Sequence, residues 1–367
     1  MFKLFFEDFN PQDHLFWWLF IAFFFAFIIA YTTFPTVIYI SKQKQLMDEP
    51  GGRSMHKNTT PTLGGISIYF SLIVVMTIVG AFLNTKTLVL VMGGLTILFF
   101  MGLKDDLTII SPIKKLFGQL LAAGLLIVFT DTRILGFSSI MGVNELPYWI
   151  SIGFTLFVYV LIINAYNLID GVDGLAGSIA LGVCLVFTYL FVDAGKLSLA
   201  TLAIALVGSL LAYLRFNFSG KNKIFMGDTG TMVVGFLLAF FTISFINLAQ
   251  TDSSSVYFRY APVLAFALLF YPLIDTLRVF FLRIVIYKKS PFSADRKHIH
   301  HKYLFFGFTH AQTTLLIASF NVIIVFLTFF IAIEYDLTLN RQILLLMVYG
   351  SYLYLIPVFF KWLFKTF

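Results

Sequence analysis

Long runs of apolar residues, separated by short polar segments, cover almost the whole chain of 367 residues. A helix needs about 20 apolar residues to cross a bilayer. The pattern predicts eleven membrane spans at 15–40, 64–83, 87–103, 116–131, 148–168, 174–193, 197–215, 229–249, 260–285, 312–333 and 342–362. Neither an internal repeat nor a low-complexity linker divides the chain. We therefore expect an all-α integral membrane protein whose residues 1–367 form a single polytopic domain.

Composition agrees with that class. Hydrophobic residues make up 59% of the chain, charged residues only 12%, and the mean hydropathy is +0.92. These values lie far outside the range of soluble proteins, and we expect a lipid bilayer rather than a nucleic acid as the main partner. The single cysteine, Cys184, rules out a disulfide framework or a cysteine metal site. The leader carries three acidic residues against one lysine, so we do not expect a cleaved signal peptide.

The cations fall mainly on one side of the expected membrane. With eleven spans, 19 of the 25 lysines and arginines follow odd-numbered spans, and the other six are Lys3, Lys86, Arg133, Lys196, Arg259 and Arg341. Cytoplasmic loops carry the excess of lysine and arginine in membrane proteins. The asymmetry predicts an outside N-terminus and a cytoplasmic C-terminus.

All polar clusters that could carry chemistry fall on this predicted cytoplasmic side. They lie at 48–65, 104–106, 164–176, 225–230 and 293–301. Clustering on one face favours a single shared site on cytoplasmic loops, whereas a transport path would place ionisable groups near the midplane. The one candidate at depth is Asp275, and Arg278 follows three residues later as a partner for it.

The segment 164–176 interrupts the hydrocarbon most strongly. It contains Asn164, Asn167, Asp170 and Asp173 together with two glycines, between two apolar runs. Ionisable residues at a bilayer edge are expensive and are therefore functional candidates. Spacing by three puts Asp170 and Asp173 on one face at a helix end, and glycine allows a ligand to approach the backbone closely. A plain polar loop is the alternative.

Three further carboxylates suggest a site for a divalent cation. Asp105 and Asp106 are adjacent and diverge by about 100° on a regular helix, although at a helix end both could face one cation. Mg²⁺ prefers one or two carboxylates together with substrate phosphates and water. Asp228, flanked by glycine just before a span, is a third candidate ligand. The alternatives are a solvated helix terminus for the pair and an N-cap for Asp228.

Basic residues gather in the loop that contains His298, His300 and His301, preceded by Arg296 and Lys297. Helical spacing predicts that His298 and His301 share a face and that His300 is turned away. This set suits an anionic phosphate better than zinc, for which further ligands at suitable spacing are lacking. Contact with anionic lipid head groups is the alternative. Arg53, His56 and Lys57 form a weaker basic set.

These motifs together resemble the polyprenyl-phosphate N-acetylhexosamine-1-phosphate transferases, membrane enzymes of glycosyltransferase family 4. The resemblance runs from about Asp48 to His301. It rests on R-x-x-H and P-x-x-G-G, the Asp-Asp pair, N-x-x-N-x-x-D-G-x-D-G-L-A, G-D-T-G, P-x-x-D-T (Pro272, Asp275, Thr276) and H-I-H-H, in that order along the chain. Each motif is short, but their order and shared side make the set specific.

The resemblance implies a reaction in a bacterial cytoplasmic (inner) membrane. A UDP-N-acetylhexosamine, with UDP-GlcNAc as first choice, would react with undecaprenyl phosphate to give lipid-linked sugar-1-phosphate and UMP. Mg²⁺, with Mn²⁺ as a substitute, would be held by Asp228 and Asp106, and Asp105 would position substrate or act as a base. Asn164, Asn167, Asp170 and Asp173 would hold the nucleotide sugar. Lys115, Arg53, His56, Arg296 and the three histidines would bind uridine or phosphate.

The branch within this family depends on the histidine loop. Ile299 interrupts the histidines, and Lys302 follows them. The phospho-N-acetylmuramoyl-pentapeptide transferases instead have three consecutive histidines followed by an acid. The sequence thus resembles the enzymes that begin O-antigen, enterobacterial common antigen or teichoic-acid synthesis, and the pentapeptide enzyme is the alternative. An ion-coupled transporter is the alternative from another class, and a homodimer stays open.

Overall fold

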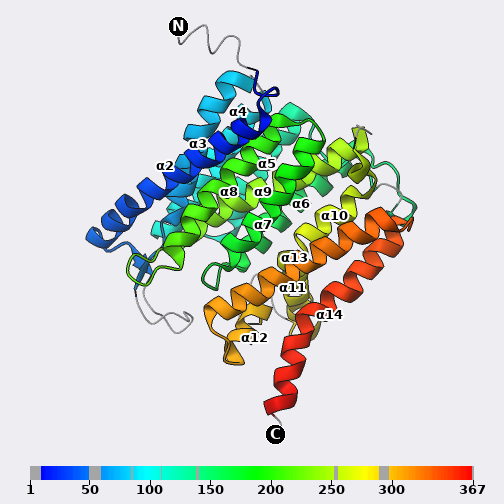
Figure 1. Ribbon diagram of the computed structural model, residues 1–367. Helices are drawn as coiled ribbons and strands as arrows, with labels where there is room; N and C mark the ends of the chain where they lie inside the picture. Colours follow the sequence, from blue (N-terminus) through cyan, green and yellow to red (C-terminus); the bar gives the residue numbers. More distant parts are fainter. Residues whose placement is uncertain are drawn as a thin grey trace.

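The computed structural model describes residues 10–48, 59–83, 86–108, 110–137, 140–251, 255–288 and 297–365, and within them it is a bundle of long helices (Figure 1). The helices are α2 (Leu15–Gln43), α3 (Gly64–Leu83), α4 (Lys86–Thr108), α5 (Pro112–Thr130), α6 (Tyr148–Leu168), α7 (Leu175–Asp193), α8 (Leu197–Asn217), α9 (Gly227–Thr251), α10 (Ala261–Leu268), α11 (Phe270–Phe281), α12 (Ile299–Phe305), α13 (His310–Glu334) and α14 (Leu339–Lys365). Short 3₁₀ turns lie at Ile140–Gly142 (η1) and Val256–Tyr260 (η2), and a π-helix at Leu282–Ile286 (η3) continues α11.

The described ranges contain fewer clear membrane spans than the eleven expected for the whole chain. Within the described ranges, eight helices are long and apolar enough to cross a bilayer, and the pair Tyr257–Leu268 and Phe270–Ile286, bent by 62°, makes nine if it counts as one span. The two remaining stretches are also helical. They are α3, of which Gly64–Gly80 forms a shorter apolar helix, and α14. The protein is therefore an all-helical, multi-pass membrane protein with eight or nine candidate spans.

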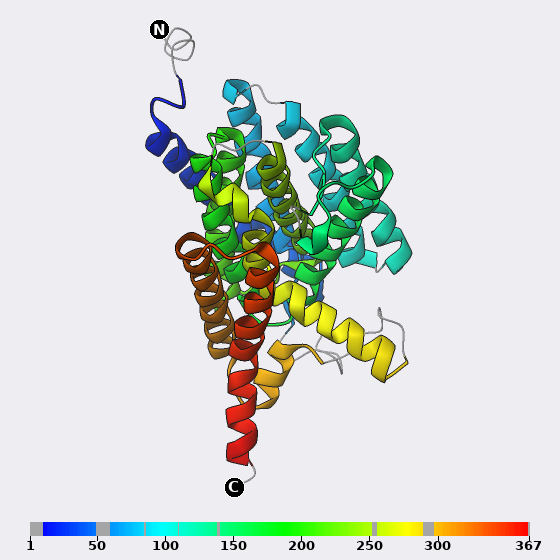
Figure 2. The same cartoon turned by 90° about the vertical axis from the view of Figure 1, so that its right-hand side faces the viewer.

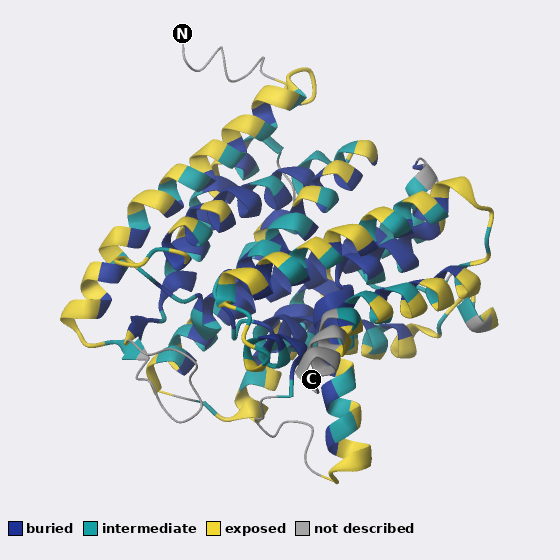
Figure 3. Ribbon diagram, turned by 60° about the horizontal axis from the view of Figure 1, so that its bottom comes forward, coloured by how far each residue is buried: buried dark blue, intermediate teal, exposed yellow. Residues whose placement is uncertain are grey.

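Helix α9 forms the centre of the bundle. In the most apolar 18-residue stretch of this helix, 78% of the residues are buried, the highest share among the candidate spans. It packs against α6, α4 and α3, and α2 and α8 pack together beside it. With the lower end of Figure 1 tilted toward the viewer, buried residues lie in the middle and exposed residues on the outside (Figure 3), and many of the exposed residues are large and apolar. A helix that is apolar on all sides suits this central position.

Alternation of the helices brings the polar segments to one end of the bundle. The described residues that follow α2, α4, α6 and α8 lie there, at the lower end of Figure 1, together with α12 and the end of α14, whereas residue 10 lies at the opposite end. The same end carries the one β-ribbon of the described ranges, in which Met47–Asp48 (β1) pairs antiparallel with Thr60–Pro61 (β2). A shared end for these segments agrees with the expected single site.

The C-terminal third is less regular. After the bend that follows α10, α11 extends away from the bundle (Figure 2), while α13 and α14 pack against each other and α13 packs against α7 and α10. Helix α12 lies beside α13 and α14 at the polar end. The bend therefore carries the P-x-x-D-T residues of α11 toward the histidines of α12.

Candidate active site

Two glycine-containing motifs that are far apart in the sequence, P-x-x-G-G and G-D-T-G, pack against each other at the polar end. The backbone N–H groups of Gly64 and Gly65 donate to the carbonyls of Phe225 and Met226 at 3.0 and 2.9 Å. A Cβ placed on Gly65 would lie 2.1 Å from the backbone nitrogen of Gly230. Only glycine permits such a close approach of two backbones. The P-x-x-G-G segment therefore fixes the start of α9, which carries Asp228.

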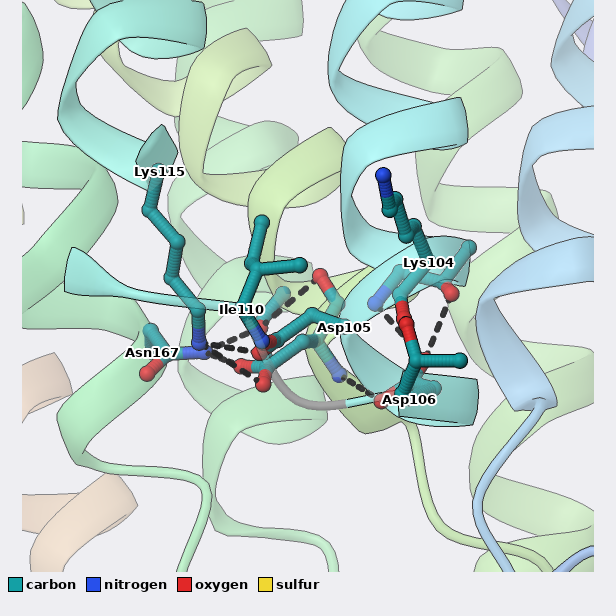
Figure 4. Close-up of polar contacts among 10 residues, drawn as sticks. Lys104, Asp105, Asp106, Ile110, Lys115 and Asn167 are labelled. Carbon is teal, nitrogen blue, oxygen red and sulfur yellow. Dashed lines mark hydrogen bonds and ion pairs between the residues drawn. The ribbon is translucent and has the colours of Figure 1, made fainter. Parts of the chain in front are cut away.

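Asp106 caps this helix from outside. Its Oδ1 accepts from the backbone N–H of Asp228 at 2.7 Å, and its Oδ2 accepts from the N–H and the hydroxyl of Thr229 at 3.0 and 2.5 Å (Figure 4). The first N–H groups of a helix lack partners within the helix, and a carboxylate there also interacts favourably with the helix dipole. The alternative reading of Asp228 as an N-cap is not what the structure shows, since the cap comes from Asp106 on α4. Both oxygens of Asp106 are engaged in it.

Asp105 and Asp228 share the ammonium group of Lys115. Lys115 forms an ion pair with the carboxylate of Asp105 and donates to Oδ2 of Asp228 at 3.0 Å. Asp105 also accepts from the backbone N–H of Ile110 at 2.6 Å. The adjacent carboxylates thus point to different partners, as their angular separation on a helix predicts. Figure 4 shows Lys115 reaching toward Asp105 from the neighbouring helix.

The two asparagines of the 164–176 segment have different surroundings. The side-chain amide of Asn167 donates to Oδ1 of Asp228 and, at 2.7 Å, to the hydroxyl of Thr231. One turn earlier, Asn164 donates to Oε1 of Gln119 at 2.8 Å and to the carbonyl of Val160 at 2.7 Å. Asn167 therefore belongs to the group around Asp228, and Asn164 ties α6 to α5 beneath it.

Residues 169–174 form the turn between α6 and α7, at the position expected for the break. Burial, followed by the nearby negative charges of Asp228, Asp173 and Asp106, raises the pKa of Asp170 well above its usual value. A carboxylate in such surroundings favours a proton or a cation. A cation bound nearby would therefore stabilise the charged form of Asp170.

Asp173 is held by residues that the sequence did not single out. Nζ of Lys223 donates to its Oδ2 at 2.6 Å, and Nδ1 of His310 lies 3.5 Å from the same oxygen. The hydroxyl of Thr314 donates to its carbonyl at 2.7 Å. Asp173 thus joins the α6–α7 turn to the segment before α9 and to the start of α13. Lys223 lies in the charged 219–223 stretch and could have been suspected, but no sequence pattern connects His310 to Asp173.

The three histidines form one group, in which His298 and His300 lie beside Asp275. Their ring centroids lie 4.3 to 6.4 Å apart, and the rings of His298 and His300 are nearly parallel at 12°. The expectation that His300 turns away from the other two is wrong. Helix α12 begins only at Ile299, and His298 is extended with ψ of 150°, so helical spacing does not apply across this stretch. Burial and the neighbouring cations and histidines lower the pKa of His300 to about 3, so its ring is neutral near pH 7.

The histidine group lies against the α6–α7 turn. A Cβ placed on Gly171 would lie 3.0 Å from Nε2 of His300 and 3.5 Å from Cε1 of His301. The predicted partner of Asp275 is confirmed, since Arg278 donates to its carboxylate at 2.8 Å. Asp275 is therefore part of the same polar end as the turn, and it offers no separate step of a transport path. Arg53, His56 and Arg296 lie outside the described residues.

The donor set suits Mg²⁺ better than a metal that needs a complete protein cage. In the described parts of the chain, no group of three or more His, Cys, Asp or Glu side chains could hold a metal ion. Mg²⁺ needs only one or two carboxylates and takes its other oxygens from phosphates and water. Asp228, beside the amide of Asn167 and near the charge of Asp170, offers such oxygens. Asp106 as a ligand remains a prediction, because its oxygens serve α9.

Comparison with known proteins gives the class. The model of glycosyl transferase family 4 matches residues 88–246, which include the Asp-Asp, 164–176 and Gly-Asp-Thr-Gly motifs. The chain is 32% identical over 292 residues to the undecaprenyl-phosphate alpha-N-acetylglucosaminyl 1-phosphate transferase of Escherichia coli O157:H7, covering 76% of this chain and 74% of that protein. It is 30% identical to a probable undecaprenyl-phosphate N-acetylglucosaminyl 1-phosphate transferase of Bacillus subtilis (strain 168), covering 80% of each.

A third relative is the decaprenyl-phosphate N-acetylglucosaminephosphotransferase of Mycobacterium leprae (strain TN), 29% identical over 82% of this chain and 80% of that protein. Fold and site together define a multi-pass membrane enzyme with a carboxylate-rich centre at one end of a helical bundle. The chain belongs to glycosyl transferase family 4 and is a prenyl-phosphate sugar-1-phosphate transferase. The resemblance inferred from the motifs is confirmed.

Proposed function

We propose that the protein transfers N-acetylhexosamine-1-phosphate, most simply from UDP-GlcNAc, to undecaprenyl phosphate. A phosphate oxygen of the lipid attacks the β-phosphorus of the nucleotide sugar, the bond between that phosphorus and the bridging oxygen breaks, and UMP leaves. The observation that carries this proposal is the convergence of Asp105, Lys115, Asn167 and Asp228 at the polar end. The names of the first two relatives contain undecaprenyl phosphate and N-acetylglucosamine, and the name of the third contains the same sugar with decaprenyl phosphate.

Charge neutralisation is the main task of such a site. Two anionic substrates must meet, and phosphoryl transfer depends mostly on positioning and electrostatic stabilisation. Mg²⁺ held by Asp228 and Asn167 would neutralise charge on the phosphates when bound. Lys115 donates to Asp228 at 3.0 Å and so brings a positive charge to the same point. Phosphates bound there would add negative charge near Asp170. Cations that bind together with the phosphates would be needed to reduce the electrostatic repulsion.

Asp105 acts as a positioning residue in this proposal. Its carboxylate accepts from the backbone of Ile110 and pairs with Lys115, and these contacts fix the ammonium. The lipid acceptor is a phosphomonoester with a second pKa near 6 by analogy with phosphorylated side chains, so at pH 7 it is largely a dianion. Such a nucleophile needs no proton removed, and a dedicated base is dispensable.

The remaining residues recognise the substrates. Asp170 and Asp173 orient the nucleotide sugar from the α6–α7 turn, and the histidine group binds its diphosphate. The position of His300 beside Gly171, where an added Cβ would lie 3.0 Å from Nε2, supports this arrangement. Burial and the charge of Arg278 lower the pKa of Lys302, which extends this basic surface. Arg53, His56 and Arg296 complete it in the proposal.

The product would enter cell-surface polysaccharide synthesis, such as O-antigen or teichoic acid, in a bacterial cytoplasmic membrane. The site would face the cytoplasm, where nucleotide sugars are made, in agreement with the distribution of lysine and arginine. Reporter fusions after Lys57, Lys221 and Lys302 should report cytoplasm, and fusions at Thr85 and Asp252 the outside. A motif loop found outside would contradict a single cytoplasmic site.

A panel of nucleotide sugars tests the substrate. Purified protein with Mg²⁺ and undecaprenyl phosphate should convert UDP-GlcNAc, its 4-epimer or a 6-deoxy relative, and should leave UDP-N-acetylmuramoyl-pentapeptide unchanged. The reason is the isoleucine that separates His298 from His300. Reaction with the pentapeptide substrate alone would overturn the choice of branch and leave the enzyme class intact.

A further inference from the structure

Asp275 is a fully buried carboxylate that holds the start of the histidine loop. Its side chain has no solvent exposure. Oδ1 accepts from the backbone N–H of Ile299 at 3.0 Å and from Nη2 of Arg278 at 2.8 Å, while Oδ2 lies 3.0 Å from Nδ1 of His298. Arg278 donates in addition to the carbonyl of Lys297. One carboxylate therefore fixes both the backbone and the ring at the start of α12.

Tyr271, one turn earlier on α11, contacts the second ring in the same way. Its hydroxyl lies 3.1 Å from Nδ1 of His300, and both side chains are buried. The Nε2 atoms of His298 and His300 are buried and have no hydrogen-bond partner among the described residues. A buried polar nitrogen without a partner is costly, so two of them side by side indicate a ligand.

We propose that Asp275 and Tyr271 are positioning residues that hold Nε2 of His298 and His300 ready to donate hydrogen bonds to a phosphate of the substrate. This inference rests on the proposed function, because it assigns the diphosphate of the nucleotide sugar to these two nitrogens. It adds α11 to the machinery of the site. Neither residue touches the substrate in this scheme; each acts through the ring that it contacts.

Hydrogen-bond chemistry leads to this assignment. A carboxylate accepts, so Nδ1 of His298 carries a hydrogen toward Asp275. Phosphate oxygens also accept, so Nε2 of His298 must carry a second hydrogen, and the ring binds phosphate as a cation stabilised by Asp275. When the Tyr271 hydroxyl donates to Nδ1 of His300, the hydrogen of that ring lies on Nε2. His300 then donates to phosphate as a neutral ring.

A double-mutant cycle on kcat/KM tests whether Asp275 acts through His298. Asp275→Asn should reduce kcat/KM by about 10–100-fold, the range for partners that orient a functional histidine. Adding it to His298→Gln should cost little more than His298→Gln alone, because the second residue works only through the first. If the double variant loses kcat/KM by the product of the two single-variant losses, the inference is overturned. Asp336→Asn, which removes a carboxylate from the exposed pair with Arg259, serves as the matched control.

The pH profile separates positioning from general damage to the loop. Asp275→Asn removes the negative charge that favours the cationic ring, so the alkaline limb of the pH profile of kcat/KM should move toward lower pH. A loss by the same factor at every pH would contradict the inference. This variant keeps the other charged and titratable groups around Asp275, which come from α11, from α12 with its N-cap and from α14: Tyr271, Arg278, His298, His300, Lys302, Tyr303 and Tyr354.

Tyr271→Phe gives a second test that does not depend on the buried charge. It removes one hydroxyl and keeps the ring, so the protein should fold, and kcat/KM should fall by about 10-fold or more. The loss should vanish in a His300→Gln background. Unchanged kcat/KM in Tyr271→Phe would overturn the role of Tyr271. Failure of wild-type protein to release UMP would instead contradict the proposed function.

Discussion

Lys115 and Asp228 meet although 113 residues separate them, and Nζ of Lys115 donates to Oδ2 of Asp228 at 3.0 Å. The same ammonium pairs with Asp105, so one cation holds two carboxylates from two helices. Replacing Lys115 with methionine should lower kcat by about 10²–10³-fold, as loss of a preorganised charge does in other active sites. Lys114→Met is the matched control, since Lys114 is exposed, and it should leave kcat within about twofold. Equal losses in both variants would remove the assigned role of Lys115.

Substitutions of Asp106 can distinguish its role in capping α9 from a role in binding Mg²⁺. Asp106→Ala removes three hydrogen bonds at the start of α9 and should destabilise the protein by about 1 kcal/mol, measured by thermal or denaturant unfolding in detergent. Asn keeps only one of the two acceptor oxygens, so Asp106→Asn should lose part of that stability but less than Asp106→Ala, and it should still fold. The dependence of its activity on Mg²⁺ then decides the second role. An unchanged Mg²⁺ requirement assigns Asp106 to the helix alone, whereas a strongly raised requirement makes it a ligand.

Asp170 should show a conflict between stability and function. The pKa of Asp170 is higher in the folded protein than in the unfolded chain. At a pH between these two pKa values, the folded protein therefore holds a proton that the unfolded chain has lost. The free energy of unfolding consequently falls as the pH rises through the folded-state pKa. Asp170→Asn removes the charge that is disfavoured at neutral pH. The ligand-free variant should therefore have a higher Tm than wild type at pH 7–8 while losing activity. A lower Tm across this pH range would show that the carboxylate is stabilised by contacts absent from this account.

The junction of the glycine motifs can be tested within a single helix. Gly65→Ala would push a Cβ to within 2.1 Å of the backbone at Gly230 and should displace Asp228, with loss of activity and stability. Gly80→Ala lies in the same helix, where a Cβ would meet no described atom within 4 Å, and should stabilise it by up to about 1 kcal/mol. Full activity of Gly65→Ala would contradict the close packing of these two segments.

Much of this architecture could be predicted from the sequence because hydrophobic runs and motif order are strong signals. Each expected span coincides with a helix or with the bent pair, the break at 169–173 is confirmed, and Lys115 lies beside the Asp-Asp pair. The orientation of His300 was mispredicted because the start of α12 depends on the tertiary contact between Asp275 and the backbone of Ile299. The cap by Asp106 and the contact of His310 with Asp173 join segments more than 100 residues apart, and no local periodicity contains them.

The fate of the β-phosphate tests the central claim most directly. UDP-GlcNAc labelled with ³²P at the β-position is incubated with purified protein, Mg²⁺ and undecaprenyl phosphate, and the lipid and nucleotide fractions are separated. The account predicts that the label enters the lipid in step with release of unlabelled UMP, and that Asp228→Asn abolishes both while remaining folded. Label that stays in the nucleotide fraction as UDP would mean attack at the anomeric carbon and would contradict sugar-1-phosphate transfer by this site.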